Sequence, residues 1–122
     1  MSKQLLKLLP IVLFMIMYAC TSDNEEDLFP DSDCDAKNVT YSQTVTSIIQ
    51  SNCLSCHSQN IQTAGINLEG YNNIKVYAQN GFLYGAISHA PGFTPMPFGG
   101  AKLSACDIQK IKAWIDAGAL NN

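Results

Sequence analysis

The chain has 122 residues, which is enough for one small domain and too few for two. Only 14% of the residues are charged, and the formal net charge is −3. The sequence contains no arginine and therefore lacks the arginine-rich surface typical of nucleic-acid binding, so we expect no nucleic-acid partner.

Residues 1–19 have the pattern of a targeting segment. Lys3 and Lys7 supply positive charge, and residues 8–17 form an apolar run broken only by Pro10. This run is shorter than the about 20 apolar residues that a membrane-spanning helix needs, and it is typical of a secretory signal peptide. We therefore expect residues 1–19 to direct export and to lie outside the fold.

The end of this segment, Tyr18-Ala19-Cys20, resembles the lipobox of bacterial lipoproteins, in which a small residue directly precedes a cysteine. The resemblance implies that Cys20 is lipidated and anchors the protein to a membrane, facing the periplasm or the cell surface. The alternative is ordinary export, with Cys20 removed or without a role.

Residues 20–36 have the composition of a disordered acidic tether. Seven acidic residues and no basic one lie between Ser22 and Asp35, and such a segment cannot bury a core. The folded domain is therefore predicted over residues 37–122. Residues 36–122 hold five lysines against three acids, a net charge of +2. This charge favours an acidic partner protein, although the lysines can equally be ordinary solvated surface.

The domain is predicted to begin with a helix. Thr40 and Gln43 have the spacing of a capping box. Apolar residues then recur on one helical face as far as Asn52, and they are Tyr41, Val45, Ile48 and Ile49.

This helix leads directly into Cys53-Leu54-Ser55-Cys56-His57, which has the Cys-x-x-Cys-His pattern of covalent haem attachment. Two thiols, here Cys53 and Cys56, can add to the two vinyl groups of a haem and hold it by thioether bonds. His57 can then bind the iron as proximal ligand through a neutral ring nitrogen. We therefore expect one haem c per chain.

The same motif has two other interpretations. The Cys-x-x-Cys pair can be half of a structural zinc site, but such a site usually needs a second cysteine pair at similar spacing. The two other cysteines, Cys34 and Cys106, are isolated from each other. A thioredoxin-like redox pair needs a βαβ unit, and no long apolar strand precedes Cys53. A haem-free module held together by zinc or a disulfide is thus an alternative.

After the motif, the sequence predicts a loop over residues 58–70, a helix from about Asn72 to Asn80 and a shorter helix from about Phe82 to Ser88. We expect the loop to wrap one edge of the haem.

Residues 91–100 contain three prolines, three glycines and Met96, which stands between Pro95 and Pro97. Prolines restrict the backbone of their neighbours, so Met96 is expected in a stiff, non-helical loop. The other methionines lie in the targeting segment. We therefore predict Met96 as the distal iron ligand, which raises the reduction potential. The alternative is a methionine that fills a gap in the core.

His89 is the rival distal ligand, since it is the only other histidine. It can instead hydrogen-bond a haem propionate or the loop backbone, or lie at the surface.

The last helix is predicted to begin at Ser104 as N-cap, with Asp107 in its first turn, and to end at Gly118. Its apolar face comprises Ile108, Ile111 and Ile115, with Trp114 on the flank.

Cys34 and Cys106 remain as a pair. In an exported protein two such cysteines usually form a disulfide, and closing a loop of about 70 residues stabilises a fold by about 4 kcal/mol. The bond requires the first and last helices to meet. Free thiols are the alternative.

The order of elements is a helix, the Cys-x-x-Cys-His motif, a methionine loop and a closing helix. This order is similar to that of small monohaem cytochromes c. From Ala64 onward the chain resembles planctomycete-type cytochrome c domains and their Bacteroidota relatives more narrowly. The matching segments are Ala64-Gly65-Ile66-Asn67-Leu68, Pro95-Met96-Pro97, Gly99-Gly100-Ala101-Lys102-Leu103-Ser104 and Ile111-Lys112-Ala113-Trp114-Ile115-Asp116-Ala117-Gly118-Ala119.

This resemblance, which covers about residues 38–120, implies an all-α cytochrome c fold of three to five short helices around one haem, with the first and last helices crossing. By it Cys53, Cys56, His57 and Met96 take the haem roles. It implies a monomeric electron carrier between redox partner proteins and no enzyme, because a six-coordinate iron has no open site for substrate. If Met96 does not bind iron, the alternative is a peroxidase-like enzyme or a sensor.

Overall fold

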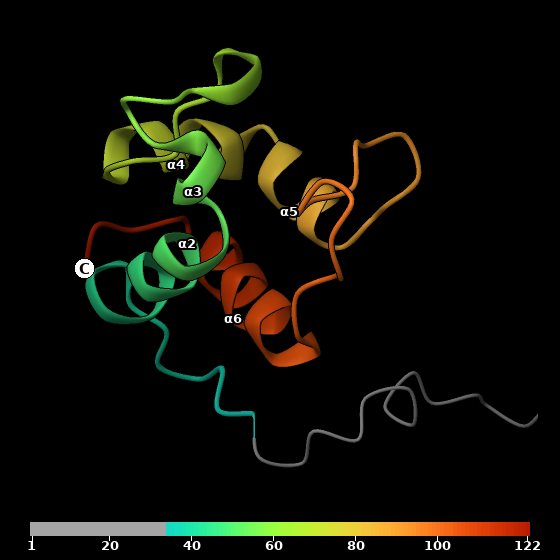
Figure 1. Cartoon of the computed structure of the whole chain (residues 1–122). Helices are drawn as coiled ribbons and strands as arrows, with labels where there is room; N and C mark the ends of the chain where they lie inside the picture. The colour runs from blue at the N-terminus through green and yellow to red at the C-terminus, as the bar shows by residue number, and fades with distance from the viewer. Residues whose placement is uncertain (1–33) are drawn as a thin grey trace, which may run out of the picture. The chain divides into compact units, whose positions relative to one another are not determined.

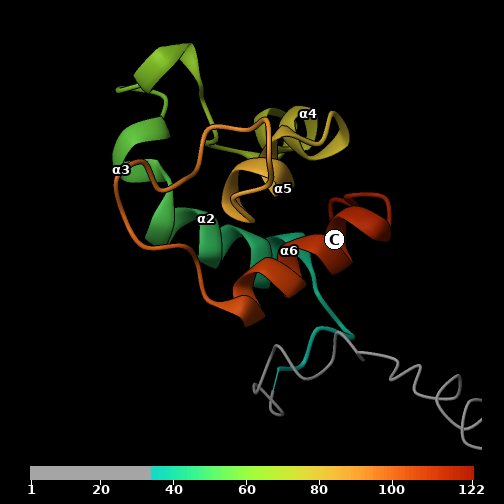
Figure 2. The same cartoon turned by 90° about the vertical axis from the view of Figure 1, so that its right-hand side faces the viewer.

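The computed structural model describes residues 34–122 (Figures 1 and 2). The predicted signal segment, Cys20 and the tether up to residue 33 lie outside the described residues. Within residues 34–122 the regular structure is helical and contains no strand, which confirms the predicted all-α class. None of the helices in this range is long and apolar enough to cross a membrane.

The helical segments in chain order are the π-helical turn η3 (Tyr41–Val45), α2 (Thr46–Asn52), α3 (Leu54–His57), the 3-10 turn η4 (Thr63–Gly65), α4 (Tyr71–Gln79), α5 (Phe82–Ile87) and α6 (Ala105–Asp116). The first two are continuous, so residues 41–52 form the predicted N-terminal helix. The bounds of α4 and α5 lie one residue or less from the predicted ones.

The core lies where the N-terminal helix packs against α6 (Figure 1). Val45 and Ile111 are fully buried and Trp114 is 1% exposed. Trp114, which was predicted on the flank of the apolar face, is buried more fully than Ile108 and Ile115, which are half-buried. The buried face passes through positions 111 and 114, which are adjacent on a helix surface.

The N-terminus of the first helix is closed by a residue at the other end of the sequence. The Tyr41 N–H donates to Oδ1 of Asn122, and the Ser42 N–H donates to the Asn122 backbone oxygen, each at 2.9 Å. Thr40 makes no side-chain capping bond. The predicted capping box is therefore wrong, because the free N–H groups of the first turn have found partners elsewhere.

The C-terminal tail is fixed by two aromatic side chains. The Trp114 indole N–H donates to the Leu120 carbonyl at 2.8 Å, and the Tyr71 hydroxyl donates to the Ala119 carbonyl at 2.9 Å. Gly118 has φ 98°, a left-handed conformation that glycine adopts without steric cost, and it lets the chain turn after α6.

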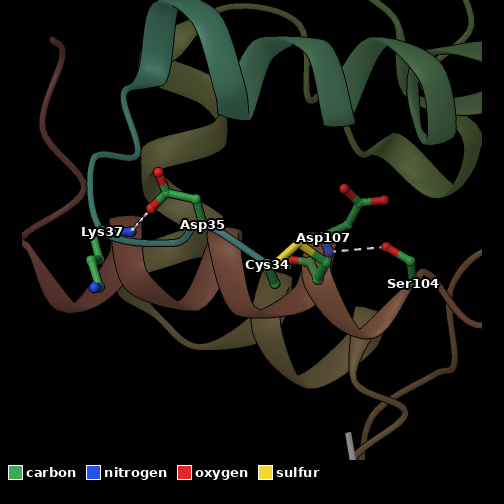
Figure 3. Close-up of a disulfide and its surroundings, with 6 residues drawn as sticks. Cys34, Asp35, Lys37, Ser104 and Asp107 are labelled. Atoms are coloured by element: carbon green, nitrogen blue, oxygen red, sulfur yellow. Dashed lines mark hydrogen bonds between the residues drawn. A yellow bond between two sulfur atoms is a disulfide. The ribbon is translucent and has the colours of Figure 1, made fainter. Parts of the chain in front are cut away.

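The first turn of α6 carries a cap and a disulfide (Figure 3). The Ser104 hydroxyl accepts a hydrogen bond from the Asp107 N–H at 3.0 Å, which confirms the predicted N-cap. Cys106 is bonded to Cys34, 72 residues earlier, which confirms the predicted disulfide. The bond joins the start of the described chain to the start of its last helix.

Removing this disulfide is expected to lower the free energy of unfolding by about 4 kcal/mol, since it releases a closed loop that spans 72 positions. The measurement is urea denaturation of the full chain and of the double variant Cys34→Ser/Cys106→Ser. Each single serine variant serves as a control, because it replaces only one of the two sulfurs. Equal midpoints for the native and double variants would contradict the expectation.

Candidate functional site

Cys53 marks the junction between α2 and α3. Its backbone angles, φ −124° and ψ −38°, depart from helical values, so the chain bends there. Hydrogen bonding nevertheless continues across the bend, because the Cys53 N–H donates to Ile49 and the His57 N–H donates to the Cys53 carbonyl, both at 2.9 Å. The Cys-x-x-Cys-His motif is thus held as one short turn at the end of the N-terminal helix.

The two cysteines of the motif are free thiols with different surroundings. Cys53 is half-buried and packs against the hydrophobic core, whereas Cys56 is exposed. Burial raises the pKa of Cys53 to about 11, because apolar surroundings disfavour the thiolate. A free Cys53 thiol is therefore protonated at neutral pH.

His57 is buried, and its ring is oriented by the backbone. Its Nδ1 lies 3.3 Å from the carbonyl oxygen of Ile66. A carbonyl can only accept a hydrogen bond, so this bond places the proton on Nδ1 and leaves the Nε2 lone pair available to a metal. A hydrogen-bonded second nitrogen is the usual arrangement of a metal-binding histidine.

The same loop also binds the main chain of the histidine. The Leu68 N–H donates to the His57 carbonyl at 2.8 Å, two residues after the contact with the ring. Residues 66–68 therefore hold His57 at two points. The sequence does not reveal this support, because a backbone carbonyl has no residue-type pattern.

Met96 is half-buried, and its main chain is held on both sides. Its N–H donates to the Ala86 carbonyl, and its own carbonyl accepts from Nε2 of His89, each at 3.0 Å. The expectation that His89 bonds the loop backbone is confirmed. The backbone of Met96 is thus anchored to the end of α5, and the anchoring bonds do not engage its thioether.

The methionine loop also docks on α5 through an aromatic ring. The Phe93 ring lies so close to Gly85 that a Cβ added at Gly85 would stand 2.5 Å from Phe93 Cγ. Only glycine permits this approach, because real Cβ atoms do not come so near. The Phe93 ring also meets Phe82 edge-on, with ring centroids 5.7 Å apart.

The loop between α5 and α6 lies opposite α3. In Figure 1 α3 is on one side of α5 and the orange loop on the other; in Figure 2, seen from the right, that loop passes in front of α3 and α2. The two views together place the loop and the Cys-x-x-Cys-His turn at similar height, facing one another across the domain.

Residues 34–122 show neither a zinc cluster nor the strands of a thioredoxin-like unit, whereas a haem-free module held by a disulfide is compatible with the Cys34–Cys106 bond. Cys34 and Cys106 are bonded to each other and cannot serve as zinc ligands. Across residues 34–122, no group of three or more histidine, cysteine or acidic side chains is gathered as a metal would need. A thioredoxin-like pair would require strands, and the described range has none.

Comparison of the chain with protein-family models, with curated proteins and with solved structures found no match. The assignment of a function therefore rests on the residues and their geometry.

In the haem-free protein, iodoacetamide is expected to label Cys56 well before Cys53 at pH 8. The rate of alkylation is proportional to the thiolate fraction. A pKa of about 11 in place of the ordinary 9.0 leaves Cys53 with roughly 100-fold less thiolate. Since the pKa is raised, Cys53 labelling should keep accelerating as the pH rises toward 11. Peptide mass spectrometry measures both rates. In urea the difference should vanish, and equal rates in the folded protein would contradict the burial argument.

Proposed function

We propose that the protein is an exported, monohaem c-type cytochrome that carries single electrons between redox partner proteins. The observation that carries the proposal is the turn of residues 53–57. It presents two free thiols three positions apart and a buried His57 whose Nδ1 is engaged by Ile66, which leaves Nε2 as the ligating atom. These residues fit a covalently attached haem.

Each residue has a definite role in this proposal. Cys53 and Cys56 hold one haem c by thioether bonds, His57 is the proximal iron ligand and Met96 the distal one. The haem supplies a one-electron iron couple. The chain would supply the attachment, the two side chains that bind the iron and an apolar environment built on the packed helices. Thioether ligation favours the ferrous state and raises the reduction potential.

Electron transfer is preferred to catalysis because His57 and Met96 together complete the coordination of the iron. With both bound, no position stays open for a substrate. A peroxidase-like enzyme or a sensor would require Met96 to be off the iron, and the two backbone bonds that fix Met96 in its loop leave its thioether free to bind a metal.

The Cys34–Cys106 disulfide supports export, because disulfides form and persist in oxidising compartments. We further propose that Cys20 is lipidated and that the acidic tether holds a monomeric domain away from the membrane, facing the periplasm or the cell surface. The lysines of the domain would favour an acidic redox partner.

The central test is the visible spectrum of the full chain expressed with a c-type haem maturation system. We expect a haem that stays with the denatured chain and a weak iron–sulfur charge-transfer band in the oxidised protein. In Met96→Ala the band should disappear and carbon monoxide should bind readily to the reduced protein. Met96→His is the matched control, since it removes the sulfur but keeps a sixth ligand.

Two results would contradict the proposal. Covalent haem without the charge-transfer band, reacting readily with peroxide or carbon monoxide, would favour the enzyme or sensor. A colourless, folded protein would exclude haem.

Lipidation is tested in a bacterial host that processes lipoproteins. The protein is expected in the membrane fraction, with the mass of residues 20–122 plus that of the attached lipid. Cys20→Ser should be exported but recovered in the soluble fraction. Equal distribution of the two proteins would indicate ordinary export.

A further inference from the structure

His89 occupies a left-handed backbone conformation, which is uncommon for residues other than glycine. Its φ is 56°, in the left-handed region, directly after α5. Its N–H donates to the Ala86 carbonyl at 3.3 Å, so the residue turns the chain at the end of the helix. Glycine or asparagine would adopt this conformation at lower cost. At this turn the imidazole ring is directed at a specific partner.

The ring binds the backbone of the proposed distal ligand. Nε2 of His89 lies 3.0 Å from the carbonyl oxygen of Met96, and since a carbonyl only accepts, Nε2 carries the proton and donates. In Pro95-Met96-Pro97 the prolines have no N–H, so Met96 holds the only backbone donor. That donor is used on Ala86. The other end of Met96, its carbonyl, is held by a donor from outside the tripeptide, and His89 supplies it.

The thioether of Met96 cannot be oriented in the same direct way. Sulfur is a weak acceptor with no proton to donate, and the side chain has three rotatable bonds. Ordering the backbone in advance removes part of the entropy that iron binding would otherwise have to overcome.

We propose that His89 is a positioning residue for Met96: its Nε2–H bond to the Met96 carbonyl holds the loop in the conformation from which the thioether binds iron. The inference rests on the proposed function, because it requires Met96 to be the distal ligand. His89 acts on the iron only through Met96.

Two amide variants separate this role from a backbone preference. His89→Gln places an amide N–H near the position of Nε2, within reach of the Met96 carbonyl. His89→Asn places it near the position of Nδ1, one bond too short. Asparagine tolerates φ 56° better than glutamine. If the backbone conformation of residue 89 is what matters, His89→Asn is the milder change. If the hydrogen bond to Met96 is what matters, His89→Gln is the milder change.

The experiment uses the full-length holoprotein and titrates the oxidised form with imidazole, which competes with Met96 for the iron. His89→Gln is expected to bind imidazole within about twofold of the native affinity. His89→Asn is expected to bind it about threefold to tenfold more tightly, with a weaker charge-transfer band, because loss of one hydrogen bond raises the population of the open site. His89→Gly, which has no donor and adopts a positive φ freely, should match the Asn variant.

The outcomes distinguish this inference from the function beneath it. If the native protein shows the charge-transfer band and the Asn and Gly variants bind imidazole with the native affinity, the positioning role is overturned and the electron carrier stands. The positioning role is likewise overturned if the Gln and Asn variants tighten imidazole binding equally. If the native protein has covalent haem without the band, the proposed ligation by Met96 fails, and the inference fails with it.

Discussion

The contact between the N-terminal helix and α6 is the constraint on which the rest of the domain depends. It buries Val45, Ile111 and Trp114, and side chains of this size each stabilise a fold by roughly 1.5–3 kcal/mol when buried. The Cys34–Cys106 bond ties the chain just before the first helix to the first turn of α6, and Asn122 closes the other end of the contact on residues 41 and 42. The remaining buried hydrophobic residues belong to the same core cluster.

This contact also determines where the candidate ligands lie. The Cys-x-x-Cys-His turn follows α2 directly, so its direction is set by the N-terminal helix. The methionine loop ends at Leu103 and Ser104, which enter α6, so its far end is set by the partner helix. The near end is set by α5, which packs against α6 and accepts the bond from Met96. The two candidate ligands, about 40 positions apart in the sequence, are thus carried by elements whose positions the same helix contact sets.

Features that depend on neighbouring residues could be predicted from the sequence. The Ser104 cap lies within one turn, the stops at Gly81 and Gly118 follow from residue type, and the helical bounds follow from apolar spacing. The Cys34–Cys106 pair was predictable as well, because only two cysteines of the domain lie outside the haem motif and the chain carries the pattern of an export signal.

Features that depend on distant backbone groups could not be predicted. Thr40 and Gln43 have a sound capping pattern, but Asn122, about 80 residues away, binds the same N–H groups instead. The Ile66 carbonyl that orients His57 has no identity in the sequence, since any residue offers a carbonyl. Trp114 lies closer to the centre of the buried face than predicted, because spacing shows which residues share a face and not which of them the partner helix covers.

The two candidate iron ligands are positioned by different means, and the chemistry of their side chains explains why. An imidazole has two nitrogens, so His57 can give one to the Ile66 carbonyl and keep the other for a metal. A thioether has a single sulfur, and any bond that oriented it would compete with the iron. Met96 therefore has to be positioned through its main chain, by Ala86 on one side and His89 on the other. The prolines beside it have no N–H, and the His89 side chain supplies the donor that holds its carbonyl.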